Sequence, residues 1–213
     1  MNDARGRSEP YLQSCRSEFW QKVFRLELEY LVQHLQGCRD ILSVGCGPAF
    51  IEGGLAARGF NVTGLDVSRE ALNCAPDRVR TVASRAEEMP FPDSSFDAVI
   101  YIASLQFVED YRSALDRSAS VLRPSGRILV MLLNPESGFF KSRYRDPGSY
   151  VSKIRHVDVK ALERAAAQLF VLRTEYFLGV KAKEIFESAD PADAVLYVME
   201  GCKRAPSGRA EHS

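Results

Sequence analysis

Apolar residues along the chain follow two alternating patterns. In residues 14–36 they recur at three- and four-residue spacing, which predicts an amphipathic helix packed against a sheet. Short apolar runs bounded by turn residues then predict strands at 40–46, 61–67, 79–84, 96–104 and 126–134. Helical patterns between these runs predict helices at 50–59, 68–75 and 111–122. Such alternation is typical of a parallel sheet with helices on both faces.

The C-terminal third breaks this alternation. Residues 157–170 have a helical pattern, and two further apolar runs follow at 171–179 and 193–203. The connection between these runs has no long helical pattern, so we expect the two strands to pair antiparallel at one edge. The sequence therefore predicts an α/β fold whose sheet has seven strands, is mostly parallel, and carries an antiparallel edge strand.

Size and composition favour one domain. The chain has 213 residues, of which 46% are hydrophobic, so we expect a single domain over 1–213 with flexible ends at 1–10 and 205–213. The 28 basic residues balance the 28 acidic ones, which disfavours a nucleic-acid or membrane partner.

The cysteines and the N-terminus favour a cytoplasmic protein. The five cysteines form no C-x-x-C pair and have no zinc-like spacing with histidine, so we expect reduced thiols and no metal. The polar N-terminus does not resemble a signal peptide, and no apolar stretch approaches the ~20 residues that span a bilayer.

A glycine turn at the end of the first strand is the main candidate binding feature. Gly45 and Gly47 lie where open parallel sheets bind ligands, but Phe50 occupies the third small position of a dinucleotide fingerprint. The lysine and hydroxyl of a phosphate-binding loop are also missing. Asp66 ends the second strand 21 residues after Gly45, where a carboxylate can accept hydrogen bonds from both ribose hydroxyls. These residues favour a ligand with a ribose and no phosphate.

Three stretches carry a family resemblance. "ILSVGCGPAFIEGGLAARGFNVTGLDVS", "AEEMPFPDSSFDAVIYIASLQFVED" and "LRPSGRILV" resemble successive motifs of the class I S-adenosylmethionine-dependent methyltransferases that act on small molecules. The resemblance runs from about 38 to 133. It implies a single Rossmann-like domain, S-adenosylmethionine as cofactor, and transfer of its methyl group by in-line displacement to a small-molecule acceptor.

The resemblance also implies a set of cofactor contacts. The backbone of Gly45, Cys46 and Gly47 would face the methionine part, Asp66 would hold the ribose, and Val67 would pack on the adenine. At the end of the fourth strand, the backbone of Ala103 and Ser104 would pass beneath the methionine part. Gln106 stands where many relatives have histidine and would touch the cofactor or substrate, or cap the next helix.

One position departs from the family pattern. At this position the family usually has an aspartate whose carboxylate accepts a hydrogen bond from the adenine amino group. The next residue in the family is an alanine whose backbone N–H donates to an adenine ring nitrogen. This chain has Arg85 there, followed by Ala86 and Glu87. Ala86 therefore keeps its expected role, and Glu87 is the candidate substitute for the missing acid.

The catalytic residues and the acceptor site are less defined. Methyl transfer from a sulfonium needs a nucleophile held near attack geometry rather than a catalytic triad or a metal. Residues 134–156 interleave aromatic and basic side chains and are the candidate substrate-cap segment. Within it, Tyr144 and His156 are the candidate catalytic residues, His156 as a general base.

Other functions stay open at this point. A nicotinamide-dependent oxidoreductase and a module that binds S-adenosylmethionine without transferring its methyl group are both compatible with the fold. Transfer to RNA or protein is disfavoured by the balanced charge, although basic residues at 141–156 keep it open. The sequence does not define the acceptor, the accepting atom or the oligomeric state.

Overall fold

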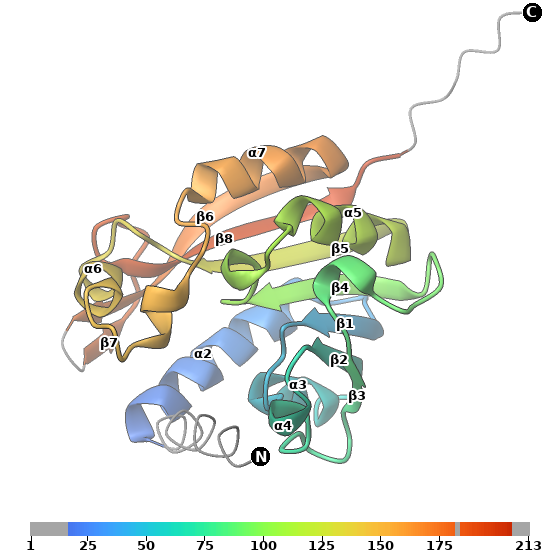
Figure 1. Ribbon diagram of the computed structural model, residues 1–213, viewed down its shortest axis with the longest axis horizontal. Helices are drawn as coiled ribbons and strands as arrows, with labels where there is room; N and C mark the ends of the chain where they lie inside the picture. The colour runs from blue at the N-terminus through green and yellow to red at the C-terminus, as the bar shows by residue number, and fades with distance from the viewer. Residues whose placement is uncertain (1–16, 182–183, 206–213) are drawn as a thin grey trace, which may run out of the picture.

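A mixed β-sheet forms the centre of the molecule (Figure 1). A computed structural model describes residues 17–181 and 184–205; residues 1–10 and 206–213 of the ends expected to be flexible lie outside this part. The strands run in the order β3-β2-β1-β4-β5-β8-β6-β7. Their bounds are β1 Asp40–Val44, β2 Asn61–Asp66, β3 Arg80–Ala83, β4 Phe96–Ile102, β5 Leu122–Leu133, β6 Phe170–Lys181, β7 Glu184–Phe186 and β8 Ala194–Lys203.

The pairing confirms the predicted mixed sheet and corrects its size. Strands β1 to β5 pair parallel, and β8 lies antiparallel between β5 and β6. The described part of the chain has eight strands, so the prediction of seven is wrong. The extra strand is β7, which pairs antiparallel with the end of β6. At three residues it is too short to give a readable alternation.

Helices cover both faces of the sheet, as predicted. Figure 1 shows α5 and α7 together on one face, with α2 and α3 on the other. The helix bounds are α2 Glu18–His34, α3 Phe50–Ala56, α4 Arg69–Leu72, α5 Tyr111–Val121, α6 Gly138–Tyr144 and α7 Val159–Leu169. Short 3₁₀ turns lie at η1 Ala86–Glu88, η2 Leu105–Phe107 and η3 Tyr150–Lys153.

The strands supply two apolar layers because their side chains alternate between the faces. On β4, Val99 packs with α5 and α7, while Ile100 packs with α2 and α3. Both side chains are fully buried. No helix in the described ranges is long and apolar enough to cross a membrane.

Local signals in the sequence set the helix ends. Ser68 caps α4 by accepting a hydrogen bond from the Ala71 N–H at 3.2 Å, as its position before the helix predicts. Helix α3 ends at Ala56, three residues before Gly59, whose φ of +94° turns the chain toward β2.

The candidate substrate-cap segment, residues 134–156, contains α6 and η3. Ser137 caps α6 through the Phe140 N–H at 3.1 Å. Phe140, Val151 and Ile154 are buried in the layer that also contains α2. The segment is therefore packed against the face of the sheet on which α2 lies.

Candidate functional site

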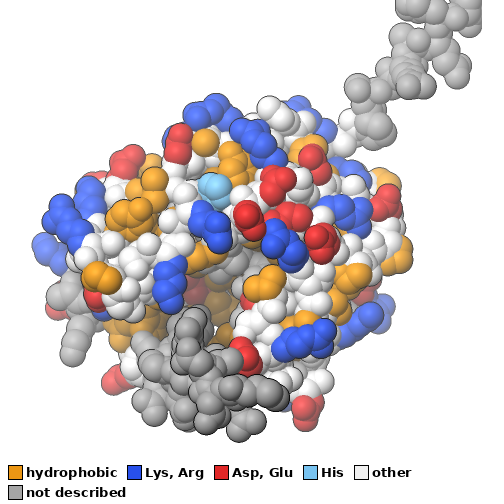
Figure 2. Space-filling model, viewed as in Figure 1, with side chains coloured by type: hydrophobic (Ala, Val, Ile, Leu, Met, Phe, Trp, Pro, Cys, Tyr) orange, Lys and Arg blue, Asp and Glu red, His pale blue; other side chains and the backbone are white. Residues whose placement is uncertain are grey.

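A cavity of about 600 Å³ lies at the C-terminal ends of the parallel strands. Its walls include Val44, Leu65, Ile102 and Leu133, which end or nearly end β1, β2, β4 and β5. Figure 2 shows this face of the molecule hollowed near its middle, with acidic and basic side chains gathered along one side. The volume falls in the range of about 300–1,000 Å³ that is typical of small-molecule sites.

The glycine turn forms one wall of this cavity. Gly45 has a φ of +73°, and a Cβ there would lie 2.5 Å from the Cβ of Ser104. The Gly45 N–H donates to the Leu65 carbonyl at 2.7 Å, which ties the turn to β2. Gly47 has a φ of +53° and faces open space. Close packing against Ser104 thus excludes a side chain at Gly45, and the left-handed backbone favours glycine at both Gly45 and Gly47.

Asp66 fixes the turn to the loop after β2. Its Oδ2 accepts a hydrogen bond from the Gly47 N–H at 2.8 Å, and its Oδ1 accepts one from the Ser68 N–H, also at 2.8 Å. An ionised carboxylate has about four acceptor positions, so each oxygen keeps a free one. Val67, which also lines the cavity, is 70% exposed and leaves an apolar surface beside this carboxylate.

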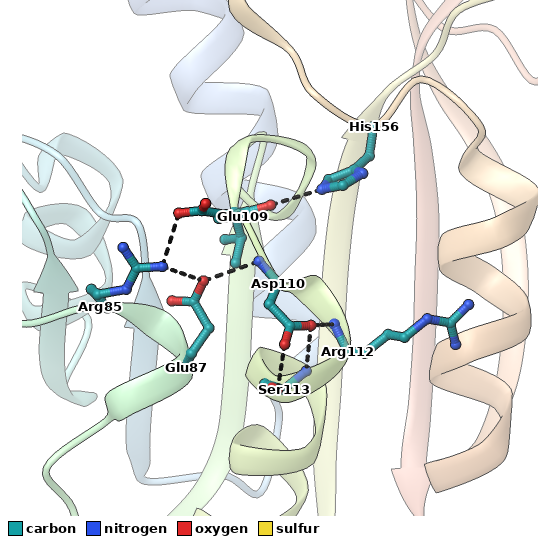
Figure 3. A network of polar contacts seen from close by, with 8 residues as sticks. Arg85, Glu87, Glu109, Asp110, Arg112, Ser113 and His156 are labelled. Carbon is teal, nitrogen blue, oxygen red and sulfur yellow. Dashed lines mark hydrogen bonds and ion pairs between the residues drawn. The ribbon is translucent and has the colours of Figure 1, made fainter.

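A charged network holds the acid after Arg85 (Figure 3). The Arg85 guanidinium bridges Glu87 at 3.2 Å and Glu109 at 3.1 Å. The Oε1 of Glu87 also accepts the Asp110 N–H at 3.1 Å, while its Oε2 accepts no hydrogen bond from the described residues. Glu87 and Ala86 both line the cavity. Arg85 therefore orients Glu87 and does not exclude it from the cavity.

The end of β4 passes beneath the glycine turn. Ala103 has a φ of +48° and donates its N–H to the Met131 carbonyl at 2.9 Å. The Ser104 hydroxyl donates to the Val44 carbonyl at 2.5 Å, which joins β4 to the start of the turn. Both residues line the cavity.

Gln106 occupies a different place from the other candidates. Its side chain is fully buried and does not line the cavity. The amide donates to the Leu133 carbonyl at 3.1 Å and to the His156 carbonyl at 3.4 Å, and it accepts the Leu133 N–H at 2.7 Å. Gln106 thus ties the end of β5 to residue 156. The N-terminal cap of the next helix, α5, is Asp110 and not Gln106.

The two candidate catalytic residues also lie outside the cavity lining. Tyr144 ends α6, is 43% exposed, and stacks on Phe140. The Nε2 of His156 lies 2.8 Å from the Val108 carbonyl, and the ring packs edge-on against Tyr111. Since a carbonyl only accepts, Nε2 carries the hydrogen and is not free to act as a base.

Aromatic side chains form the wall that the sequence did not define. From α2 come Phe19, Trp20 and Phe24, whose spacing had indicated only packing against the sheet. Phe24 stacks on Phe50 with 6.0 Å between ring centroids, and Trp20 meets Phe139 of α6 edge-on at 6.3 Å. Phe107, Tyr150 and Arg155 complete this side. The substrate-cap segment thus contributes three cavity residues: Phe139, Tyr150 and Arg155.

Two buried carboxylates on the same wall were also missed. Glu27 of α2 is 6% exposed and Glu52 of α3 is 3% exposed, and both line the cavity. Burial raises the pKa of Glu27 from 4.5 to about 8, and the nearby charge of Glu52 adds to this rise. Burial likewise raises the pKa of Glu52 to about 7. For Glu27, the sequence offered one signal of burial: this acid lies four residues after Val23, within the apolar stripe of the helix.

Comparison with known proteins gives a consistent result. A family model described as a methyltransferase domain matches residues 42–130. A ubiquinone biosynthesis O-methyltransferase from Alkalilimnicola ehrlichii is 32% identical over 192 residues, which cover 85% of this chain and 71% of that protein.

Solved structures share the fold at lower identity. A Thermotoga maritima structure described as a SAM-dependent methyltransferase, possibly a histamine N-methyltransferase, has a TM-score of 0.74 at 20% identity and covers 93% of this chain and 99% of its own. The [4+2]-cyclase SpnF has a TM-score of 0.62 at 23% identity, covering 76% of this chain and 63% of its own. This fold therefore also occurs in a protein whose name describes a cyclisation and not a methyl transfer.

Proposed function

Because the chain belongs to the S-adenosylmethionine-dependent methyltransferases, we propose that its cavity holds this cofactor beside an apolar small-molecule acceptor. One observation carries the proposal: nine of the ten residues expected to contact the cofactor line a single cavity. They come from the ends of β1, β2 and β4 and from the loop after β3. The exception is Gln106.

The chemistry of these residues fits the cofactor. Asp66 has free acceptor positions for both ribose hydroxyls, and exposed Val67 offers a surface for the adenine ring. Ala86 and Glu87 would meet the adenine edge, Glu87 through its Oε2, which accepts no hydrogen bond from the part of the chain that the structure describes. The backbone of Gly45, Cys46 and Gly47 would line the methionine part, together with that of Ala103 and Ser104.

The protein would act mainly by positioning. When bound, S-adenosylmethionine supplies a methyl group on a positively charged sulfur. The rigid turn at Gly45 and Ser104 would hold one side of the reacting pair, and the aromatic side chains of α2 and α6 would exclude water from the other. Gln106 would act indirectly, by keeping Arg155 and His156 against β5.

The aromatic wall supports an aromatic or otherwise apolar acceptor. Six aromatic side chains line the cavity beside the residues expected to contact the cofactor: Phe19, Trp20, Phe24, Phe107, Phe139 and Tyr150. A relative named as an O-methyltransferase of ubiquinone biosynthesis is in keeping with an acceptor of this kind. Among the basic residues of the 141–156 segment, only Arg155 lines the cavity, which gives little support for RNA as acceptor.

Family membership removes the nicotinamide-dependent alternative. The alternative of binding without transfer is tested by incubating the protein with methyl-labelled S-adenosylmethionine and fractionated small molecules from a cell extract. We expect label in an apolar fraction. Firm binding of S-adenosylhomocysteine with no labelled fraction would contradict methyl transfer to a small molecule.

A matched pair of variants tests the acceptor wall. Phe139→Ala should reduce labelling while leaving S-adenosylhomocysteine affinity within about twofold, because the ring lines the cavity and is not among the residues expected to contact the cofactor. Tyr144→Ala changes the other end of the same helix outside the cavity and should behave as wild type. Equal effects of the two substitutions would refute the assignment.

A further inference from the structure

Glu27 and Glu52 are the two nearly fully buried acids of the cavity wall. They are contributed by neighbouring helices, α2 and α3, which pack so closely that a Cβ at Gly54 would clash with the Leu28 side chain. The charge of Glu52 acts on Glu27, which indicates that the two carboxyl groups lie near each other. They form a single acidic feature inside the cavity.

The hydrogen bonds of this pair are incomplete. The Ser43 hydroxyl donates to Oε1 of Glu52 at 2.6 Å. Glu27 has no hydrogen bond or ion pair with any residue in the described ranges, and Glu52 has no ion pair there. Every described side-chain oxygen that is sealed from solvent does have a partner. The unpartnered oxygens of Glu27 therefore face accessible space, and the space that Glu27 lines is the cavity.

Two such carboxylates need a cation when both are ionised. Moving a carboxylate out of water is costly unless an opposite charge or several hydrogen bonds replace the lost hydration. Within the described ranges, the groups that donate to the pair are neutral: the Ser43 hydroxyl and the backbone N–H of Glu52, both bonded to the Glu52 carboxyl group. A ligand that carries a positive charge would offset the cost for both acids at once.

The surrounding wall selects the kind of cation. Trp20 and Phe24 lie seven and three residues before Glu27 and line the same cavity. Aromatic rings attract organic cations through their faces and offer no ligand to a hard metal ion. The described residues also contain no group of three or more side chains that could hold a metal. An alkylammonium group matches both the carboxylates and the rings.

We propose that Glu27 and Glu52 together form a subsite that binds an alkylammonium group inside the cavity. The inference rests on the proposed function, because that function provides two sources of this chemistry. One source is the α-ammonium of the cofactor's amino-acid part, and the other is an amine on the methyl acceptor.

The subsite also couples ligand binding to protons. The charge of Glu52 acts on Glu27, the charge of Asp66 at the end of β2 acts on Glu52, and the Cys46 thiol in the glycine turn lies in the field of both Glu52 and Asp66. Burial raises the pKa of Cys46, so the thiol stays neutral, and Asp66 adds negative charge. Without a cation the pair retains a proton near neutral pH, and binding of an ammonium group releases it.

Binding measurements with paired ligands test the subsite. The proteins are wild type, Glu27→Gln, Glu52→Gln, and the control Glu29→Gln, which removes an exposed acid from the same helix. S-adenosylhomocysteine carries the ammonium group, and 5′-methylthioadenosine lacks it. Phenethylammonium and the uncharged 2-phenylethanol form the corresponding pair for the acceptor. Calorimetry at constant pH gives each affinity.

The two sources predict different results. If the cofactor supplies the ammonium, Glu27→Gln and Glu52→Gln should weaken S-adenosylhomocysteine at least about tenfold and leave 5′-methylthioadenosine within about twofold. If the acceptor supplies it, the same variants should weaken phenethylammonium and leave both nucleosides and 2-phenylethanol unchanged. Unchanged affinity for 5′-methylthioadenosine also shows that a variant is folded.

Other outcomes overturn the proposal. Wild-type affinity of both variants for S-adenosylhomocysteine and phenethylammonium would refute it, as would equal weakening of the charged and uncharged ligands. An effect of Glu29→Gln as large as that of Glu27→Gln would do the same. Failure of the proposed function looks different, because wild-type protein would then bind neither nucleoside.

Discussion

Removing the charge of Glu27 should make the unliganded protein more stable at high pH. Burial raises the pKa of Glu27 from 4.5 to about 8, so the folded protein binds a proton that the unfolded chain releases. The contribution of this group to stability is therefore complete below about pH 4.5 and is lost as the pH rises toward 8. Glu27→Gln has no proton to lose and keeps nearly the same volume.

The expected magnitude follows from the size of the pKa change. At about 1.4 kcal/mol for each pKa unit, ionisation of Glu27 costs the folded protein at most about 5 kcal/mol. About 4 kcal/mol of this cost falls between pH 5 and pH 9. In proteins, water penetration and local relaxation generally lower the cost of burying a charge, so we expect a difference of about 2–4 kcal/mol.

Urea denaturation at pH 5 and pH 9 measures this difference. The free energy of unfolding of Glu27→Gln, minus that of wild type, should be larger at pH 9 than at pH 5 by the amount given above. Glu52 titrates in both proteins, so the measured difference contains the Glu27 ionisation together with its coupling to Glu52. Glu29→Gln, on the exposed side of the helix, should show no such change. Parallel pH curves for Glu27→Gln and wild type would refute the reasoning.

Three other substitutions test separate parts of the site. Gly45→Ala should lower the free energy of unfolding, measured in denaturant, by about 1–3 kcal/mol. The reason is that the new Cβ would lie 2.5 Å from that of Ser104 and that φ at this position is positive. Wild-type stability of the variant would show that the turn is not tightly packed. Glu87→Gln should weaken the binding of S-adenosylhomocysteine about tenfold. Glu109→Gln, which removes the other partner of Arg85, should change this affinity less. A larger effect of Glu109→Gln would contradict the assignment of Glu87 to the adenine. Gln106→Ala should lower the free energy of unfolding by about 1–3 kcal/mol, because it leaves the Leu133 backbone groups unpaired. It should also increase hydrogen exchange of the amides near residue 156. A change in cofactor affinity alone would indicate that Gln106 contacts the cofactor.

The fold was largely predictable because its signals are local. Apolar runs between turn residues located β1 to β6 and β8, and Gly59 marked the turn after α3. The boundaries of β5 were less readable: the strand begins at Leu122, although Pro124 and Gly126 indicate a turn. A register shift between Phe96 and Ala98 on β4 accommodates this irregular start.

The cofactor side of the site was also readable, for a related reason. Gly45, Gly47 and Asp66 follow directly after strands, and parallel strands bring their C-terminal ends to one edge of the sheet. Position along the chain was therefore enough to predict that these residues converge on one cavity. Their contacts with the cofactor remain predictions.

The acceptor side depends on tertiary packing and was not readable. Glu27 looks like an ordinary acid of an amphipathic helix until α3 places Glu52 beside it. His156 looks available in the sequence, but it lies outside the cavity lining and its Nε2 contacts the Val108 carbonyl across 48 residues. Composition identified residues 134–156 as a group, and only the fold separates Phe139 from Tyr144.

The central claim is that the cavity binds S-adenosylmethionine through Asp66. Calorimetric titration of S-adenosylhomocysteine into wild type, Asp66→Ala and the exposed control Asp77→Ala tests it most directly. We expect binding to wild type and Asp77→Ala, and a loss of about a hundredfold in Asp66→Ala, since two charge-assisted hydrogen bonds to the ribose disappear. Equal affinity for all three proteins, or binding of NAD in place of S-adenosylhomocysteine, would contradict the account.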